Sequence, residues 1–235
     1  MDPNLIYAQA LFAPIGESAG YRYLKKISDL AIGIELLGVG SNFHSFNINN
    51  FTRKQVDKNK DKYTLYLLFG DVFYSRAVSH LLKFNDSLVF TEILNSLKSV
   101  HHSRLLLHRE MLKLIENKDY LAEIMDKKIG LLLGINSLFK NTIILGWSLV
   151  PKNLKDASEI NEIYKLANAI THAKSFIELE RFLREFAHHF NLELDMEALA
   201  EKKAFIEGQL DVIISKLKQN WLKENFQGIT GVLLR

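Results

Sequence analysis

Residues that break helices are scarce in this sequence. Three prolines and twelve glycines occur in 235 residues, whereas turn-rich β folds need both residue types at frequent intervals. Hydrophobic residues make up 48% of the chain and charged residues 24%, which is enough apolar material for a sizeable core and too much for disorder. The sequence therefore predicts an all-α fold with long helices.

Helix-capping residues and apolar periodicity divide the chain into seven or eight helices with short links. Asp86, Asp119, Asp156 and Asp195 are each placed to cap a helix N-terminus, and Glu159, three residues after Asp156, suggests a capping box. The expected helices span about residues 2–12, 21–43, 62–84, 86–116, 119–145, 156–190 and 195–222, with a last short helix around residues 229–233. We expect one helical-bundle domain over residues 1–235.

Composition excludes several classes of protein. The absence of cysteine rules out disulfides and thiolate metal sites and fits the reducing cytoplasm, where we expect the protein to act. A net charge of +3 is too mild to imply nucleic acid, and the basic stretch 53–62 is typical of a solvated loop. We expect no signal peptide. The segment 129–150 is the nearest to a membrane span, but polar residues in its middle favour a buried core helix.

No catalytic constellation is visible from residue spacing alone. His101-His102 and His188-His189 are adjacent pairs, whose side chains diverge by about 100° on a helix and so form no chelate. The chain has no nucleophile-elbow sequence and no phosphate-binding glycine loop.

The helix expected at 62–84 is apolar almost all round, which predicts burial on most sides. It contains the charged Asp71 and the small residues Gly70 and Ala77. Two interpretations stay open for this helix: a tightly packed core helix with a hydrogen-bonded Asp71, or a subunit interface.

Its sequence "LLFGDVFYSRA" resembles the Gly-Asp helix of the trans-polyprenyl diphosphate synthases. The stretch 109–134, "REMLKLIENKDYLAEIMDKKIGLLLG", resembles a second conserved stretch of that family. Lys128 stands where the family keeps a diphosphate-binding lysine, but Ile129 replaces its threonine. The closing "KENFQGITGVLLR" resembles the family's final helix, whereas its N-terminal glycine-lysine-arginine signature is not recognisable.

The two aspartate-rich motifs of that family are broken here. "IELLGVGSNFHSFNIN" resembles the helix end that carries the first motif, with His44 matching the preceding histidine. The three aspartates of the first motif fall on Ser45, Phe46 and Asn49. Those of the second fall on Lys174, Ser175 and Glu178 in "ANAITHAKSFIE". In the family these motifs bind magnesium ions that stabilise the departing diphosphate, a task for several hard oxygen ligands. The resemblance therefore implies a chain that has lost its catalytic metal sites.

The family contains heterodimeric heptaprenyl and hexaprenyl diphosphate synthases in which one, smaller subunit lacks both motifs. Resemblance to that subunit implies a non-catalytic chain that binds no cofactor. Its catalytic partner would carry the aspartate-rich motifs and Mg²⁺. The pair would extend farnesyl diphosphate with isopentenyl diphosphate to make a quinone side chain, and the small subunit would help to set product length.

The same resemblance places the subunit interface on the helix 62–84. The expected interface residues are Gly70, Asp71, Phe73, Tyr74 and Ala77. Asp71 is expected to be buried and structural, accepting hydrogen bonds from Arg76 or Lys128, and Lys128 is a possible remnant of diphosphate binding.

Two other functions are compatible with the sequence. One is a self-associating, degenerate homologue that binds a prenyl lipid or a diphosphate as a homodimer without turning it over. The other is an ordinary helical interaction protein.

Overall fold

The computed structural model describes residues 5–16, 21–44, 60–116, 133–190, 194 and 196–234. Every regular element within these ranges is helical, so the predicted all-α class is confirmed for them. The α-helices are α1 (Ile6–Phe12), α2 (Tyr21–His44), α4 (Lys60–Phe84), α5 (Ser87–Glu116), α8 (Ser137–Leu149), α9 (Ile160–Phe190), α10 (Met196–Ser215) and α11 (Asn220–Leu233). Two short 3₁₀ turns, η4 (Lys152–Leu154) and η5 (Ala157–Glu159), precede α9.

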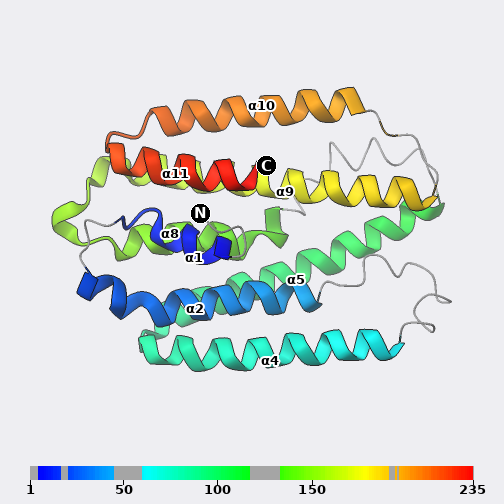
Figure 1. Ribbon diagram of the computed structural model, residues 1–235, viewed down its shortest axis with the longest axis horizontal. Helices are drawn as coiled ribbons and strands as arrows, with labels where there is room; N and C mark the ends of the chain where they lie inside the picture. The colour runs from blue at the N-terminus through cyan, green and yellow to red at the C-terminus, as the bar shows by residue number, and fades with distance from the viewer. Residues whose placement is uncertain are drawn as a thin grey trace.

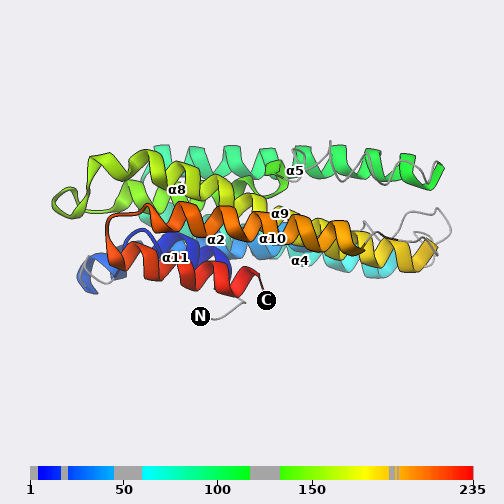
Figure 2. The ribbon, with the colours of Figure 1, turned by 90° about the horizontal axis from the view of Figure 1, so that it is seen from above.

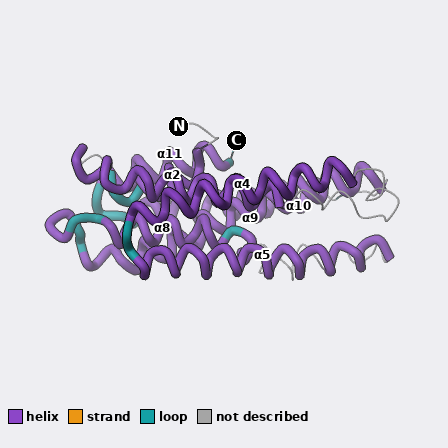
Figure 3. Tube along the Cα trace, turned by 90° about the horizontal axis from the view of Figure 1, so that it is seen from below, coloured by secondary structure: helices purple, strands orange, loops and turns teal. Residues whose placement is uncertain are grey.

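The long helices lie side by side along one axis of an elongated bundle. Figure 1 shows α10 at one edge and α4 at the opposite edge, with the short α1 beside α8 in the middle. The orthogonal views place α5 along a further edge (Figures 2 and 3). Helix α1 packs between α2 and α8, and α9 contacts both α8 and α10. The fold thus encloses α1 and α8 among longer helices.

The hydrophobic core is centred on α1, α2, α8, α9 and α11. Phe139 on α8, Leu11 on α1 and Phe226 on α11 are fully buried members of one apolar cluster. Gly146 permits α8 to approach α1 closely, because a Cβ at this position would overlap the Leu11 carbonyl oxygen of α1. Helix α8 begins at Ser137 and continues through Gly146 to Leu149, whereas the predicted helix ended near Leu145.

Capping residues fix several helix boundaries. The Asp86 carboxylate accepts the backbone N–H groups of Leu88 and Val89, both at 3.0 Å, which confirms Asp86 as the cap of α5. Asp156 likewise accepts the N–H of Ser158 at 2.8 Å. The proposed caps Asp119 and Asp195 lie outside the described residues.

The expected capping box at Asp156 and Glu159 is wrong in its second half. The buried Glu159 carboxylate does not turn back to Asp156 but accepts the N–H groups of Lys218 at 2.8 Å and Gln219 at 3.2 Å. These bonds stabilise a turn between α10 and α11. The predicted single helix to about residue 222 is therefore wrong, because α10 ends at Ser215 and α11 begins at Asn220.

Helix α4 is less buried than its composition predicted. It packs mainly against α2, and Ala77 and Leu81 on the contact side are buried. Its outer side leaves several large apolar residues in solvent, namely Leu65, Leu68, Phe69, Val72 and Leu82. The prediction of burial on most sides is thus wrong, and α4 is an edge helix with an apolar outer face.

Residues 137–149 of the apolar segment 129–150 form α8, and most of its apolar side chains are buried, as predicted for a core helix. Within the described ranges, no helix has both the length and the apolar character needed to cross a bilayer.

Candidate functional site

The structure brings together the three positions that match the second aspartate-rich motif. Lys174, Ser175 and Glu178 lie on one stretch of α9, facing Asn136 at the start of α8. The first-motif positions Ser45, Phe46 and Asn49, together with Lys128, lie outside the described residues. The candidate site is therefore built from the second motif and from the described residues around it.

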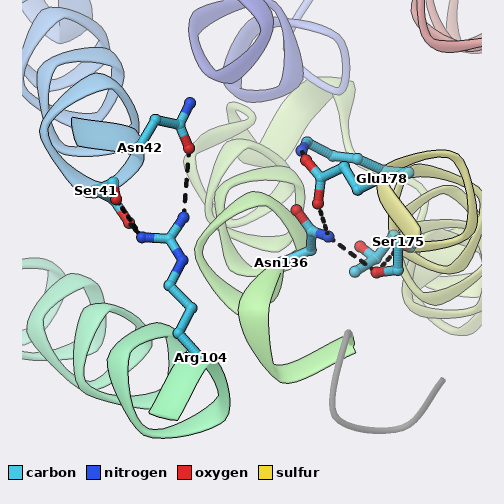
Figure 4. Close-up of polar contacts among 8 residues, drawn as sticks. Ser41, Asn42, Arg104, Asn136, Ser175 and Glu178 are labelled. Carbon is cyan, nitrogen blue, oxygen red and sulfur yellow. Dashed lines mark hydrogen bonds and ion pairs between the residues drawn. The ribbon is translucent and has the colours of Figure 1, made fainter. Parts of the chain in front are cut away.

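Hydrogen bonds connect these α8 and α9 side chains into one network. The Lys174 ammonium forms an ion pair with Glu178 Oε1, one turn further along α9. The Asn136 amide donates to Glu178 Oε2 at 2.8 Å and to Ser175 Oγ at 3.0 Å (Figure 4). Ser175 in turn donates to the Thr171 carbonyl at 2.7 Å. Each Glu178 oxygen thus already has a strong donor from the same chain.

The pKa values of the pair are shifted in opposite directions, each toward the charged form. Burial alone would lower the pKa of Lys174, but the Glu178 carboxylate and the Tyr7 hydroxyl outweigh it, and the net shift is upward. Burial would raise the pKa of Glu178, but Lys174 and the Asn136 amide outweigh it, and the net shift is downward. Opposite shifts of this kind are typical of a charge pair that is stable at neutral pH.

Arg104 on α5 faces the same interior from the other side of the bundle (Figure 4). Its guanidinium donates to the carbonyl and the hydroxyl of Ser41, the latter at 2.6 Å, and to Asn42 Oδ1 at 3.3 Å. Burial lowers the pKa of Arg104, and the Tyr7 hydroxyl and the Glu178 carboxylate oppose that shift. This arginine joins the end of α2 to α5.

Sequence reasoning missed Arg104, although a signal was present. Buried α5 residues recur at Ser96, Val100, Ser103 and Leu107, a spacing of three to four residues that marks the inward face. Arg104 lies beside that face, and a cation at such a position needs partners. The partners at the end of α2 could be found only from the fold.

A second group of rings joins α2, α4 and α5. The His44 ring stacks on Tyr74 with centroids 4.8 Å apart, and the Tyr74 hydroxyl is hydrogen-bonded to His101 Nε2 at 2.8 Å. Burial, aided by Arg104 and His44, lowers the pKa of His101. His101 faces inward while the adjacent His102 is exposed, so the two side chains diverge as the helix geometry predicted.

Asp71 is not the buried structural residue that the sequence suggested. Its side chain is 69% exposed, and its Oδ1 lies 3.3 Å from His44 Nε2. Of the two expected partners, Lys128 lies outside the described residues, and the contact found for Asp71 is to His44 at the end of α2 and not to Arg76. The expectation of a poorly hydrated Asp71 is wrong.

The residues at the second motif do not fit a divalent cation. The Lys174 ammonium lies on the Glu178 carboxylate where a metal would need to bind, and a cation there repels Mg²⁺. Among the described residues, no group of three or more histidine, aspartate or glutamate side chains is arranged to hold a metal ion.

No protein-family model, curated protein or solved structure matches this chain. The resemblance to the trans-polyprenyl diphosphate synthases therefore stays a prediction from the sequence motifs.

Proposed function

We propose that this chain is the non-catalytic subunit of a heteromeric trans-polyprenyl diphosphate synthase with an isoprenoid-synthase type of helical bundle. Its partner would be a catalytic subunit that carries both aspartate-rich motifs and binds Mg²⁺. The complex would act in the cytoplasm, extending farnesyl diphosphate with isopentenyl diphosphate toward a quinone side chain. This chain would support the active fold of its partner and help to set product length.

The ion pair between Lys174 and Glu178 carries the non-catalytic part of the proposal. Ionisation of an allylic diphosphate needs hard, negatively charged ligands that collect metal ions. Here the one carboxylate at the second motif is neutralised by Lys174 and hydrogen-bonded by Asn136. A site already satisfied within the chain supports a structural duty rather than metal-dependent catalysis.

The outer face of α4 supports the proposal of a protein partner. We call Leu65, Leu68, Phe69 and Val72 the α4 stripe; they are 50%, 56%, 46% and 56% exposed. Their spacing of three and four residues aligns them along one face of the helix. Contiguous exposed apolar side chains mark interaction sites more often than isolated ones do.

The expected interface residues divide into two groups in the structure. Gly70 and Ala77 are buried against α2 of the same chain, so a partner would not reach them without rearrangement. Asp71 is exposed, and Phe73 and Tyr74 are half-buried. The α4 stripe is therefore the surface on which we place the partner.

A reconstitution assay tests this function. Three samples are prepared: this chain alone, a synthase subunit that carries both aspartate-rich motifs alone, and the two together. Each sample is given Mg²⁺, farnesyl diphosphate and labelled isopentenyl diphosphate. We expect no product from this chain alone and a stable complex that makes more or longer product than the other subunit alone. Magnesium-dependent product from this chain alone, or no complex and no change in product, would contradict the proposal.

A second candidate function is a self-associating homologue that binds a prenyl lipid. The observation in its favour is an apolar cavity of about 390 Å³ lined by Phe43, Leu65, Tyr66, Phe69 and Phe73. Phe43 stacks on Phe73 with centroids 5.3 Å apart, which gives the cavity an aromatic wall. A homodimer in sedimentation experiments, with saturable binding of farnesol in the absence of any partner, would favour this function over the first.

A further inference from the structure

A second cavity lies where α8, α9 and α10 meet. Its volume is about 690 Å³, within the range of roughly 300–1,000 Å³ that is usual for small-molecule sites. The lining residues are Leu133, Gly134, Ser137, Lys140, Asn141, Lys165, Asn168, Ala169, Thr171, His172 and Ile213. Lys174 and Glu178 are not among them, so this cavity is distinct from the candidate site described above.

Two lysines and a histidine line this cavity. Lys140 on α8 and Lys165 and His172 on α9 line it, and among its described lining residues there is no carboxylate. Lys165 is paired with Glu162 at 2.7 Å, whereas Lys140 has no ion pair within the described part of the chain.

His172 is a half-buried residue of the same lining. Burial lowers its pKa, and the positive charge of Lys202 on α10 lowers it further. Lys202 therefore adds positive charge near His172, although it is not one of the lining residues. An anion in the cavity would be attracted by Lys140, which has no ion pair within the described part of the chain.

The rest of the lining supplies two other kinds of contact. Asn141 and Asn168 are amides that can donate hydrogen bonds, although the Asn141 amide already donates to Ser96 Oγ at 2.7 Å. Leu133, Ala169 and Ile213 form an apolar part of the wall. Cations beside an apolar wall match a ligand with one anionic group and a small apolar body.

We propose that the α8–α9–α10 cavity binds a small organic phosphate ester. Lys140 and Lys165 hold the phosphate oxygens, Asn168 donates to them, and the apolar wall takes the organic part. The concave shape and moderate size favour a small molecule over a flat polyanion. This site is separate from the α4 stripe and does not depend on the proposed function.

Isothermal titration of the full chain tests the site. Three probes are compared. Phenyl phosphate has a phosphate and an apolar body, and inorganic phosphate lacks the apolar body. Benzoate keeps the apolar body but has a carboxylate in place of the phosphate. We expect saturable 1:1 binding of phenyl phosphate, about tenfold weaker binding of inorganic phosphate, and the weakest binding by benzoate, because it offers fewer acceptor oxygens and a single charge.

Two variants locate the binding. Lys140→Met should weaken phenyl phosphate binding about tenfold, as expected for loss of one charge-assisted hydrogen bond. Asn168→Asp adds a negative charge with almost no change in shape and should abolish binding. Lys98→Met and Asn95→Asp on the exposed face of α5 are the matched controls and should bind as the wild type does.

Circular dichroism establishes that each variant is folded before titration. The proposal is overturned if no probe binds the wild type saturably at millimolar concentration, or if the control variants lose binding as much as the cavity variants do. Equal affinity for benzoate and phenyl phosphate would also overturn the assignment to phosphate.

Discussion

The His44 ring at the end of α2 lies directly against the backbone of Gly70 on α4. A Cβ on Gly70 would overlap the Cδ2 and Nε2 atoms of that ring. The ring itself is held, because it stacks on Tyr74 and meets His101 edge-on at 6.0 Å. Gly70 is therefore required by packing within the chain, not by a left-handed backbone.

Gly70→Ala should destabilise the protein by about 1–3 kcal/mol, the usual cost of overpacking. The added methyl group must displace a ring that is fixed on two sides, and this outweighs the helix propensity gained on removing a glycine, roughly 0.5–1 kcal/mol. Urea unfolding of the variant beside wild type measures the difference.

Gly208→Ala on α10 is the matched control. A Cβ at Gly208 meets no atom within 4 Å, so the same substitution should stabilise the protein by about 0.5–1 kcal/mol through helix propensity alone. If both variants shift stability in the same direction, the His44 contact does not constrain Gly70.

The double variant Leu68→Glu with Val72→Glu tests the α4 stripe. Both side chains are more than half exposed, so the fold should lose at most about 0.5 kcal/mol. If the stripe forms the centre of the interface with the catalytic subunit, affinity should fall by 2 kcal/mol or more, roughly thirtyfold. Surface plasmon resonance with immobilised partner gives the affinity.

Phe205→Glu on α10 serves as the control for that experiment. Phe205 is 62% exposed, and α10 lies at the edge of the bundle opposite α4 (Figure 1). Phe205→Glu should leave the affinity for the catalytic subunit unchanged. An interface elsewhere would be indicated if Phe205→Glu weakened the complex and the α4 double variant did not.

Asp71→Ala should change the free energy of unfolding by no more than about 0.5 kcal/mol. The carboxylate is 69% exposed, and its contact with His44 is an exposed pair of the kind that contributes little. Thermal melting at pH 7 checks this. A loss of several degrees would mean that the contact with His44 holds the end of α2 in place.

The helices could be predicted from the sequence better than their surroundings could. Scarce breakers and the Asp86 cap located α4 and α5 to within a few residues. The break after Ser215 was missed, because the residue that stabilises the turn there is Glu159, almost sixty residues away. Local patterns do not report hydrogen bonds between distant segments.

The candidate site shows the same limit. Resemblance singled out Lys174 and Glu178, and helix geometry explains why residues four apart can pair. Asn136 and Arg104 reach this region from α8 and α5, and only the packing of those helices reveals it. The apolar composition of α4 likewise does not tell burial from an exposed interaction face.

Lys174→Met should destabilise the protein by roughly 1–3 kcal/mol, because it leaves the Glu178 carboxylate without its cation. The cost is below that of a fully buried pair, since the Glu178 side chain is 37% exposed. The double variant Lys174→Met with Glu178→Gln should recover part of the loss.

Lys165→Met is the control. Lys165, which pairs with Glu162, is more exposed than Lys174, so its loss should lower the free energy of unfolding by less than about 1 kcal/mol. Urea unfolding of the four proteins gives the comparison, and equal losses in the two single lysine variants would contradict the role given to Lys174.

Stability should fall as the pH drops from 7 toward 5, partly because of His101. The pKa of His101 is lowered by burial, with Arg104 and His44 adding to the shift, so the unfolded chain takes up this proton near pH 6.5 while the folded chain does not. The stabilising contribution is therefore fully present above about pH 7 and is lost as pH falls from 6.5 toward the folded pKa. Its slope is at most about 1.4 kcal/mol per pH unit, the value for one proton, and less where solvent screens the site.

His101→Gln removes this proton while keeping a side chain that can hydrogen-bond to the Tyr74 hydroxyl. Urea unfolding at pH 5, 6, 7 and 8 should show a shallower decline for this variant than for wild type below pH 7. The half-buried His172, whose pKa is also lowered, should still contribute a slope in both proteins, so a residual decline is expected. Identical pH profiles would mean that His101 takes up its proton as readily in the folded chain as in the unfolded one, and that the contact with Tyr74 does not depend on its charge.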